Sequence, residues 1–231
     1  MTAPPGPRAC RRVGVVGRSR SAFGGLPGLG QYGRTVTQDL LFGEDAPPAA
    51  GVPVIAATDG SARPNPGHAA GAWYVSEDCW QALPVEGTST NNVGELVANP
   101  ALLEAAPPAR PLHVVYDSTY AQKCVTTWVH SWSRGGRVPP DRWLTKEGAP
   151  VKNAPLVAAI AALLHSRRVT WSKVKSHTTL TTSEHRLNRE ADERAGAVVA
   201  ALHAGTPPRT GPGWNDALTA SGDAPGTDVH H

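Results

Sequence analysis

The stretch VPVIAATDGS, residues 52–61, decides the fold, and a second stretch of the same kind, PLHVVYDS, follows at 111–118. Each is a short apolar run that ends in an aspartate, Asp59 in the first and Asp117 in the second. Such a run, bounded by turn residues, predicts a buried strand. Two parallel strands joined through a helical crossover end at the same edge of a sheet. The two aspartates are therefore predicted to face each other there.

Further strands and helices surround these two runs. Between them, two alternating segments predict an antiparallel meander with the first strand, and a helix follows. After the second run, helical and strand patterns alternate, and the last helix has apolar residues at spacings of three and four. This order predicts one mixed α/β domain over residues 52–204. The predicted segments are strands at 69–76, 80–87 and 168–177 and helices at 88–106, 119–132, 154–166 and 187–202.

Glycine and proline crowd the two ends of the chain. The 231 residues include 24 Gly and 22 Pro, and segments rich in both without a helical or alternating period are typical of disorder. We predict a disordered, flexible tail at 1–51, which is basic because its first 38 residues hold six arginines and no acid, and a second flexible tail at 205–231. The formal net charge of +3 is compatible with a polyanionic partner but is weak evidence for one.

The cysteines and the apolar segments indicate the cellular compartment in which the protein is expected. The three cysteines, Cys10, Cys79 and Cys124, stand far apart without a C-x-x-C spacing, which argues against a zinc site or a disulfide framework. No stretch approaches the roughly 20 apolar residues that span a bilayer, so we expect no membrane association and a cytoplasmic location. The Arg-rich, acid-free start also has some likeness to a transit peptide, which stays an alternative.

Carboxylate side chains are the candidates for a metal site. Two aspartates at one sheet edge repel each other unless a cation lies between them or one is protonated, and such oxygen ligands suit Mg²⁺ or Mn²⁺. Glu95 and Asp192 come early in two predicted helices, from which both can point toward that edge. Taken singly, Asp59 and Asp117 are typical of turns or caps, and Glu95 and Asp192 of a solvated surface.

Seven motifs together resemble those of the type 1 ribonuclease H family. They occur in the family's order and nearly at its spacing, and they cover almost all of residues 52–204. Seven ordered motifs are far more specific than any single one. In this sequence they read TDGSARPNPG, TNNVGELVA, VVYDSTYA, WVHSW, PVKN, WSKVKSH and NREADERA.

The resemblance implies a five-stranded mixed sheet flanked by helices, and an endonuclease that cuts the RNA strand of an RNA/DNA hybrid. Family members use two Mg²⁺ or Mn²⁺ ions and leave 5′-phosphate and 3′-hydroxyl ends. His177 resembles the family's mobile histidine, which assists proton transfer or product release; an exposed loop histidine is the alternative. We expect a monomer. The residues that match the family's metal-binding carboxylates are Asp59, Glu95, Asp117 and Asp192.

Three asparagines match family residues that touch the minor groove of the hybrid, namely Asn65, Asn91 and Asn92. Selectivity for RNA requires polar groups that contact 2′-hydroxyls. The alternative is structural, because Asn in NPG is typical of a turn and TNN is typical of a helix cap. Both roles are compatible with each other.

The stretch WVHSWSRGGRVPPDRW, residues 128–143, resembles the basic protrusion of the family. This copy is longer and less basic than the usual form. Trp128 and Trp132 are expected to pack or to stack, and phosphate contacts are expected to give salt-sensitive affinity. The basic residues that the resemblance places near DNA phosphates are Arg134, Arg137, Arg142, Lys146 and Lys152.

Two features depart from the family's pattern. Pro100 falls in the predicted interior of the helix that bears Glu95, where it removes an N–H donor and costs roughly 3 kcal/mol. Alternatively, Asn99 caps a restarted helix that has Pro100 as its first residue. The loop between His177 and Asp192 is several residues longer than in better-known members.

Two other functions compete with hybrid cleavage. A module that binds hybrids or double-stranded RNA without cutting is favoured slightly by Pro100 and opposed by the complete carboxylate set. DNA strand transfer by a recombinase of the same fold is opposed by the TNN and PVKN motifs and by the lack of a target-DNA domain in the sequence.

Overall fold

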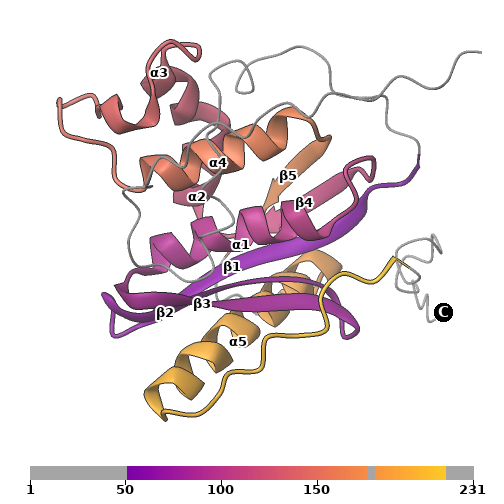
Figure 1. The fold of residues 1–231 in the computed structure, drawn as a ribbon. Coiled ribbons are helices and arrows are strands. Elements are labelled where there is room, and N and C mark those ends of the chain that lie inside the picture. The colour runs from indigo at the N-terminus through magenta and orange to yellow at the C-terminus, as the bar shows by residue number, and fades with distance from the viewer. Residues whose placement is uncertain (1–50, 176–179, 217–231) are drawn as a thin grey trace, which may run out of the picture.

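A five-stranded mixed sheet forms the centre of the fold (Figure 1). The computed structural model describes residues 51–175 and 180–216. The first three strands are antiparallel neighbours, and the last two lie parallel to the first strand on its other side. The order across the sheet is β3-β2-β1-β4-β5, which confirms the predicted α/β class. The strands are β1 (Val54–Arg63), β2 (Gly67–Ser76), β3 (Cys79–Ser89), β4 (Leu112–Tyr116) and β5 (Val169–Lys173).

The first strand, β1, is longer than predicted. Its parallel pairing with β4 ends at Ala57 opposite Val115, but its antiparallel pairing with β2 continues to Arg63. The prediction that this strand ends at Asp59 is therefore wrong, because β2 still supplies backbone partners where β4 has stopped. Asp59 and Asp117 each come two residues after this last parallel pair, Asp59 in β1 and Asp117 directly after β4. The register thus aligns the two aspartates, as the sequence predicts.

Helices cover both faces of the sheet (Figure 1). On one face lie α1 (Asn91–Ala105) and α4 (Ala154–His165), and on the other lies α5 (Ser183–His203). Within the described ranges, no helix is both long and apolar enough to cross a membrane. The buried residues of α5 include four that follow the predicted spacing of three and four: Ala191, Ala195, Val198 and Val199.

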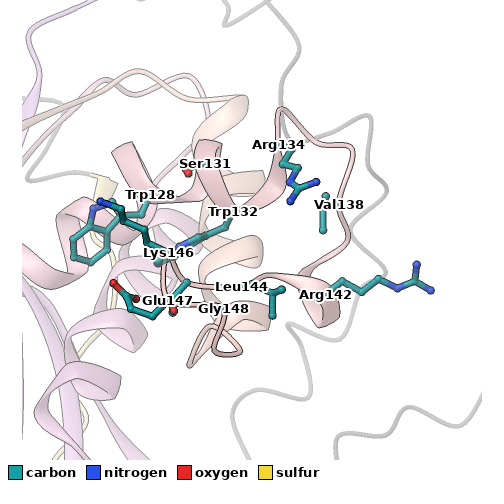
Figure 2. Close-up of a pocket in the computed structure, with 11 residues that line it drawn as sticks. Trp128, Ser131, Trp132, Arg134, Val138, Arg142, Leu144, Lys146, Glu147 and Gly148 are labelled. Carbon is teal, nitrogen blue, oxygen red and sulfur yellow. The ribbon is translucent and has the colours of Figure 1, made fainter.

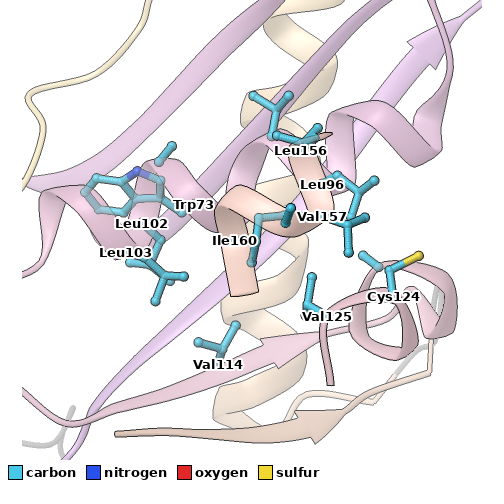
Figure 3. Close-up of a cluster of buried hydrophobic side chains, with 14 of the residues drawn as sticks. Trp73, Leu96, Leu102, Leu103, Val114, Cys124, Val125, Leu156, Val157 and Ile160 are labelled. Carbon is cyan, nitrogen blue, oxygen red and sulfur yellow. The ribbon is translucent and has the colours of Figure 1, made fainter. Parts of the chain in front are cut away.

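The core divides into two clusters of buried apolar side chains, one on each face of the sheet. The larger cluster joins β2 and β4 to α1, α4 and the helical segment after β4 (Figure 3). Burial of these side chains is what holds the helices on the sheet. Its fully buried members include Trp73, Leu96, Leu102, Leu103, Val114, Val157 and Ile160.

The helix α1 runs through Pro100 without a break. The expected disruption and the alternative restart at Asn99 are both wrong, because the helix has Thr90 as its N-cap and contains both residues. The side chain of Asn99 is buried, and its Nδ2 donates to the backbone oxygen of Glu95 at 2.8 Å. This bond adds a donor in the turn where proline has no N–H. Glu95 therefore sits on a continuous helix.

The helix predicted at 119–132 is divided into three parts. α2 (Thr119–Lys123), a π-helical turn η2 (Cys124–Trp128) and α3 (Val129–Ser133) follow one another without a gap. Inside the π turn, Thr126 Oγ1 donates to the backbone oxygen of Gln122 at 2.8 Å, a contact that often bends helices. A π turn contains one extra residue, which the apolar pattern does not reveal.

The segment after α5 packs against β3. The backbone oxygen of Thr210 accepts from Ala82 N, and Gly213 N donates to Trp80 O, both at 3.0 Å. The ring of Trp214 joins the larger core cluster. The predicted domain end at residue 204 therefore needs correction, because the packed region reaches this tryptophan. Glycine and proline content suggested a tail, but pairing with an existing strand requires only backbone groups.

Candidate active site

Three carboxylates converge beside the end of β4. Asp59 lies within β1, Asp117 directly follows β4, and Glu95 lies in the second turn of α1. One oxygen from each lies within 4.8 Å of the oxygens from the other two. Oxygen ligands at such separations can hold a divalent cation of the Mg²⁺ or Mn²⁺ type. The structure thus brings together three of the four predicted carboxylates.

Two glycines allow α1 to lie directly on the sheet and so place its glutamate. A Cβ atom on Gly94 would lie 2.3 Å from the backbone oxygen of Ala70 in β2. A Cβ atom on Gly60 would lie 2.2 Å from the backbone nitrogen of Glu95. Only residues without a side chain permit this approach. Both glycines belong to the quoted motifs, but the sequence alone did not indicate a packing role for either.

Burial and mutual repulsion raise the pKa of two of the three carboxyls. Burial, reinforced by the charge of Asp117, raises the pKa of Asp59 to about 8. Burial, reinforced by Asp59 and Asp117, raises the pKa of Glu95 to about 9. Two hydrogen bonds act in the opposite direction, one from Gly60 N to Asp59 Oδ1 at 2.6 Å and one between Ser118 and Glu95. A cation that binds these groups at neutral pH must therefore displace protons.

The helix α5 contributes two more side chains next to this cluster. Asn188 is buried, and its Nδ2 donates to Asp59 Oδ2 at 3.4 Å. Asp192 follows four residues later, on the same face of the helix, and its charge raises the pKa of both Asp59 and Glu95. The tight group of three does not include Asp192 among the described residues. Asn188 was missed in the sequence, although its spacing from Asp192 was the available signal.

Two of the three predicted groove asparagines lie side by side. Asn91 is the first residue of α1, and its backbone N–H donates to Asn65 Oδ1 at 3.4 Å. The side chain of Asn65 therefore caps the helix from the turn between β1 and β2. The N-cap is Thr90, the first residue of TNN, so the alternative reading of TNN as a helix cap is confirmed, with the threonine at the cap position. Asn92 is exposed in the first turn.

The other predicted site residues lie elsewhere. His177 falls outside the described residues. Trp128 and Trp132 pack on each other with ring centroids 5.8 Å apart, at the end of the helical segment that begins after Asp117. Lys152 is exposed just before α4. Contact of these residues with nucleic acid stays a prediction.

Comparison with known proteins identifies the family. The sequence model of the RNase H family matches residues 52–200, a range that contains the three converging carboxylates, Asn188 and Asp192. The chain belongs to the RNase H family. The RNase H match begins just before β1 and ends within α5, so it includes every strand of the sheet.

Individual RNase H proteins are similar to this chain over the same region. Ribonuclease HI of Streptomyces coelicolor is 40% identical over 150 residues, which are 63% of this chain and 61% of that protein. The chain thus matches less than two thirds of that relative. Ribonuclease H of Tropheryma whipplei, strain Twist, is 35% identical over 164 residues, which are 71% of this chain and 94% of that protein. The crystal structure of RNase H1 from Halobacterium salinarum aligns with 24% identity and a TM-score of 0.43, over 66% of this chain and 99% of the other.

Proposed function

We propose that the chain is an endonuclease that hydrolyses the RNA strand of RNA/DNA hybrids, with divalent cations as cofactors. The observation that carries the proposal is the convergence of Asp59, Glu95 and Asp117 within 4.8 Å, inside the region that matches the RNase H family. Relatives named ribonuclease H and ribonuclease HI support the same activity. A single chain contains all of these groups, so we propose that the monomer is active.

The donor set fits Mg²⁺ or Mn²⁺, because the clustered ligands are carboxylate oxygens. We propose two ions held by Asp59, Glu95, Asp117 and Asp192. Bound cations of this kind supply an activated water and stabilise the leaving oxygen, which yields 5′-phosphate and 3′-hydroxyl ends. The chain's own groups orient the ligands: Gly60 N and Asn188 bond Asp59, and Ser118 bonds Glu95.

Recognition of the hybrid is proposed to involve the turn between β1 and β2 and the start of α1. Asn65 and Asn92 are exposed there, and Asn91 is half-buried beside them. Their amides offer both donors and acceptors to 2′-hydroxyls. His177 is proposed to assist proton transfer or product release.

A cleavage assay tests this function. Labelled hybrid, duplex RNA and duplex DNA are incubated with Mg²⁺ and the full chain, and we expect only the RNA strand of the hybrid to be cut, leaving 5′-phosphates. Glu95→Gln should stop cleavage, whereas Glu104→Gln, an exposed glutamate on the same helix, should not. Hybrid that is bound but left intact by the wild type would favour the binding module instead.

We expect Mg²⁺ to raise the melting temperature more at about pH 8.5 than at about pH 6. The pKa values of Asp59 and Glu95 are about 8 and about 9 in the folded protein, but near 4 in an unfolded chain. The folded state therefore binds these protons more tightly, and cation-free stability falls as pH rises through this window. Mg²⁺ binds the ionised carboxylates, so it competes with protons at the lower pH. Thermal unfolding is measured with Mg²⁺ and with chelator at both pH values. An equal rise in melting temperature at the two pH values would contradict cation binding by Asp59 and Glu95.

A further inference from the structure

The segment that follows α5 covers part of one edge of the sheet (Figure 1). β3 is an edge strand, with β2 on its inner side. Residues 205–215, which we call the clasp, form an antiparallel bridge to β3 between Gly213 and Trp80. Gly213 N donates to Trp80 O, and Ala82 N donates to Thr210 O, both at 3.0 Å. The clasp thus binds backbone groups of β3 that face away from β2.

Side chains hold the clasp on both faces of the sheet. On the α5 face, the guanidinium of Arg209 lies 5.3 Å from the ring centroid of Trp80, which belongs to the smaller core cluster. On the α1 face, the ring centroid of Trp214 lies 6.0 Å from that of Trp73, which belongs to the larger cluster. The chain therefore crosses over the edge of β3 from one face to the other.

The clasp lies directly against the start of β3. A Cβ atom on Gly211 would lie 2.5 Å from the backbone oxygen of Trp80 and 2.7 Å from its ring. The φ angle of Gly211 is +92°, in the region that favours glycine. The backbone of Asn215 hydrogen-bonds the thiol of Cys79, which is fully buried. The clasp therefore excludes solvent, and any other chain, from this part of the edge.

The rest of the β3 edge is unfavourable for pairing. Residues that face outward alternate along a strand, so Pro84 takes the next outward position after Ala82, and proline has no N–H to donate. Glu86 is exposed at the position after that, and Gly87 leaves the extended conformation with a φ angle of +69°. Proline and charge on an edge strand oppose association with another edge. The stretch 80–82 has neither, and it is the stretch that the clasp covers.

This stretch, Trp80, Gln81 and Ala82, is complementary to a second copy of itself. In an antiparallel ladder, a residue presents its N–H and its C=O on the same side, and two opposite residues exchange both hydrogen bonds. If Trp80 lies opposite Ala82 of a second copy, the reverse pair forms as well, because a twofold axis then passes through Gln81. None of the three side chains is charged, so no repulsion opposes this pairing.

Another apolar surface lies elsewhere in the molecule. A hollow of about 850 Å³ is lined by α3 and the loop that leads to α4, and Figure 2 shows Trp128, Trp132 and Leu144 around it. Leu144 is 53% exposed. The residues that line the hollow belong neither to β3 nor to the clasp. A charge added at Leu144 therefore tests association through this surface without changing the edge of the sheet.

We propose that the clasp keeps the chain monomeric by occupying the edge of β3, and that opening of the clasp exposes a surface that binds β3 of a second copy. The clasp and the second copy compete for the same groups, Trp80 O and Ala82 N. Pairing with the clasp is favoured because the clasp directly follows α5, which gives it a high effective concentration. The inference does not depend on the proposed cleavage, because the clustered carboxylates belong to β1, α1 and the end of β4.

Gly211→Ala in the full chain tests the proposal. The new Cβ meets Trp80, so we expect the clasp to open and the dissociation constant of the dimer to fall by about tenfold or more. Sedimentation over a range of concentrations measures this constant. Gly213→Ala is the matched control, because its φ angle is +87° but its added Cβ has no atom within 4 Å; it should behave like the wild type. Trp214→Ser removes the ring anchor and should favour the dimer by a second route.

The thiol of Cys79 reports independently whether the clasp has opened. In a Cys10→Ser background, at concentrations too low for pairing, a thiol reagent should modify Cys79 about tenfold faster in Gly211→Ala than in Gly213→Ala, because local opening controls access. Cys124 is buried in the core and should react slowly in both variants.

A second substitution assigns the dimer to the edge of the sheet. Gln81→Lys, added to Gly211→Ala, places like charges opposite each other at the twofold axis and should restore the monomer. Leu144→Lys adds the same charge beside the hollow and should not. An open clasp without dimerisation overturns the proposal, as does a dimer that persists with Gln81→Lys or is lost with Leu144→Lys. Unchanged thiol reactivity in both Gly211→Ala and Trp214→Ser overturns it as well, because these contacts would then not hold the clasp.

Discussion

Asp59→Asn is expected to lower hybrid cleavage by roughly a thousandfold or more. Asp59 is the most buried of the three clustered carboxylates, at 6% exposure. Cation catalysis of this kind contributes several kcal/mol to the transition state, and each 1.4 kcal/mol corresponds to a factor of ten in rate. Asparagine keeps the shape of the side chain but provides a neutral oxygen, which is a weaker ligand. Initial rates on labelled hybrid at saturating Mg²⁺ measure the loss.

The same substitution is expected to stabilise the cation-free protein at high pH. The raised pKa of Asp59 shows that its ionised form is unfavourable in the folded state. Asparagine carries no charge at any pH, and its oxygen can still accept from Gly60 N. Asn188 Oδ1 is a buried atom that has no partner in the described structure. If the side-chain amide of Asn188 rotates, the amide of the new asparagine can donate to this oxygen.

Thermal unfolding in chelator measures this gain. The variant should melt above the wild type at about pH 8.5 and approach it at about pH 5, because the wild-type carboxyl is then protonated. Asp78→Asn, an exposed residue in the turn after β2, is the control and should change neither activity nor melting. Full activity of Asp59→Asn would exclude the carboxylate from the site.

Gly94→Ala is expected to destabilise the fold strongly, although it adds only one methyl group. The new Cβ would meet the backbone oxygen of Ala70 at 2.3 Å, and a backbone atom cannot rotate away. Overpacking typically costs about 1–3 kcal/mol, and we expect the upper end of that range. This corresponds to a drop of roughly 10 °C in melting temperature for a domain of this size.

Activity should fall further than stability alone explains. Glu95 is the next residue, so displacement of α1 moves its carboxylate away from Asp59. Misplacement by about 1 Å can cost about a hundredfold in rate. The rate is measured well below the melting temperature of the variant, so that the folded enzyme is compared.

Gly196→Ala is the matched control for this substitution. Gly196 lies within α5, and an added Cβ has no neighbour within 4 Å. Alanine at such a helical position should raise stability by about 0.5–1 kcal/mol and leave the rate unchanged. Gly94→Ala with normal stability and rate would show that α1 does not need its close approach to β2.

The sequence determined the antiparallel meander of the first strands, the parallel pairing of β1 with β4 and the meeting of Asp59 with Asp117. All three follow from local patterns: apolar runs predict strands, a helix between them predicts a parallel crossover, and parallel strands end at one edge. The regular spacing of apolar residues likewise predicted α5 and its buried face. These features depend on neighbours along the chain, so their signals are visible in it.

Predictions from composition and from helix propensity were wrong where contacts with distant segments decide the structure. Pro100 predicts a broken helix, but α1 is held on both sides by the sheet and by α4, and packing outweighs the local cost. Residues 206–214 read as a tail, but β3 offers them backbone partners. Neither the packing that supports Pro100 nor the pairing of residues 206–214 with β3 can be recognised from the sequence of the segment itself.

Only the tertiary structure decided how close the carboxylates lie and what supports them. The approach of Glu95 to Asp59 depends on Gly60 and Gly94 meeting across two elements. The hydrogen bond from Asn188 to Asp59 and the aromatic hollow beside α3 also join residues that are far apart in the chain or in separate elements. A sequence pattern reports the preferences of a segment, whereas these features depend on distances between segments. Those distances are set by the packing of the whole core.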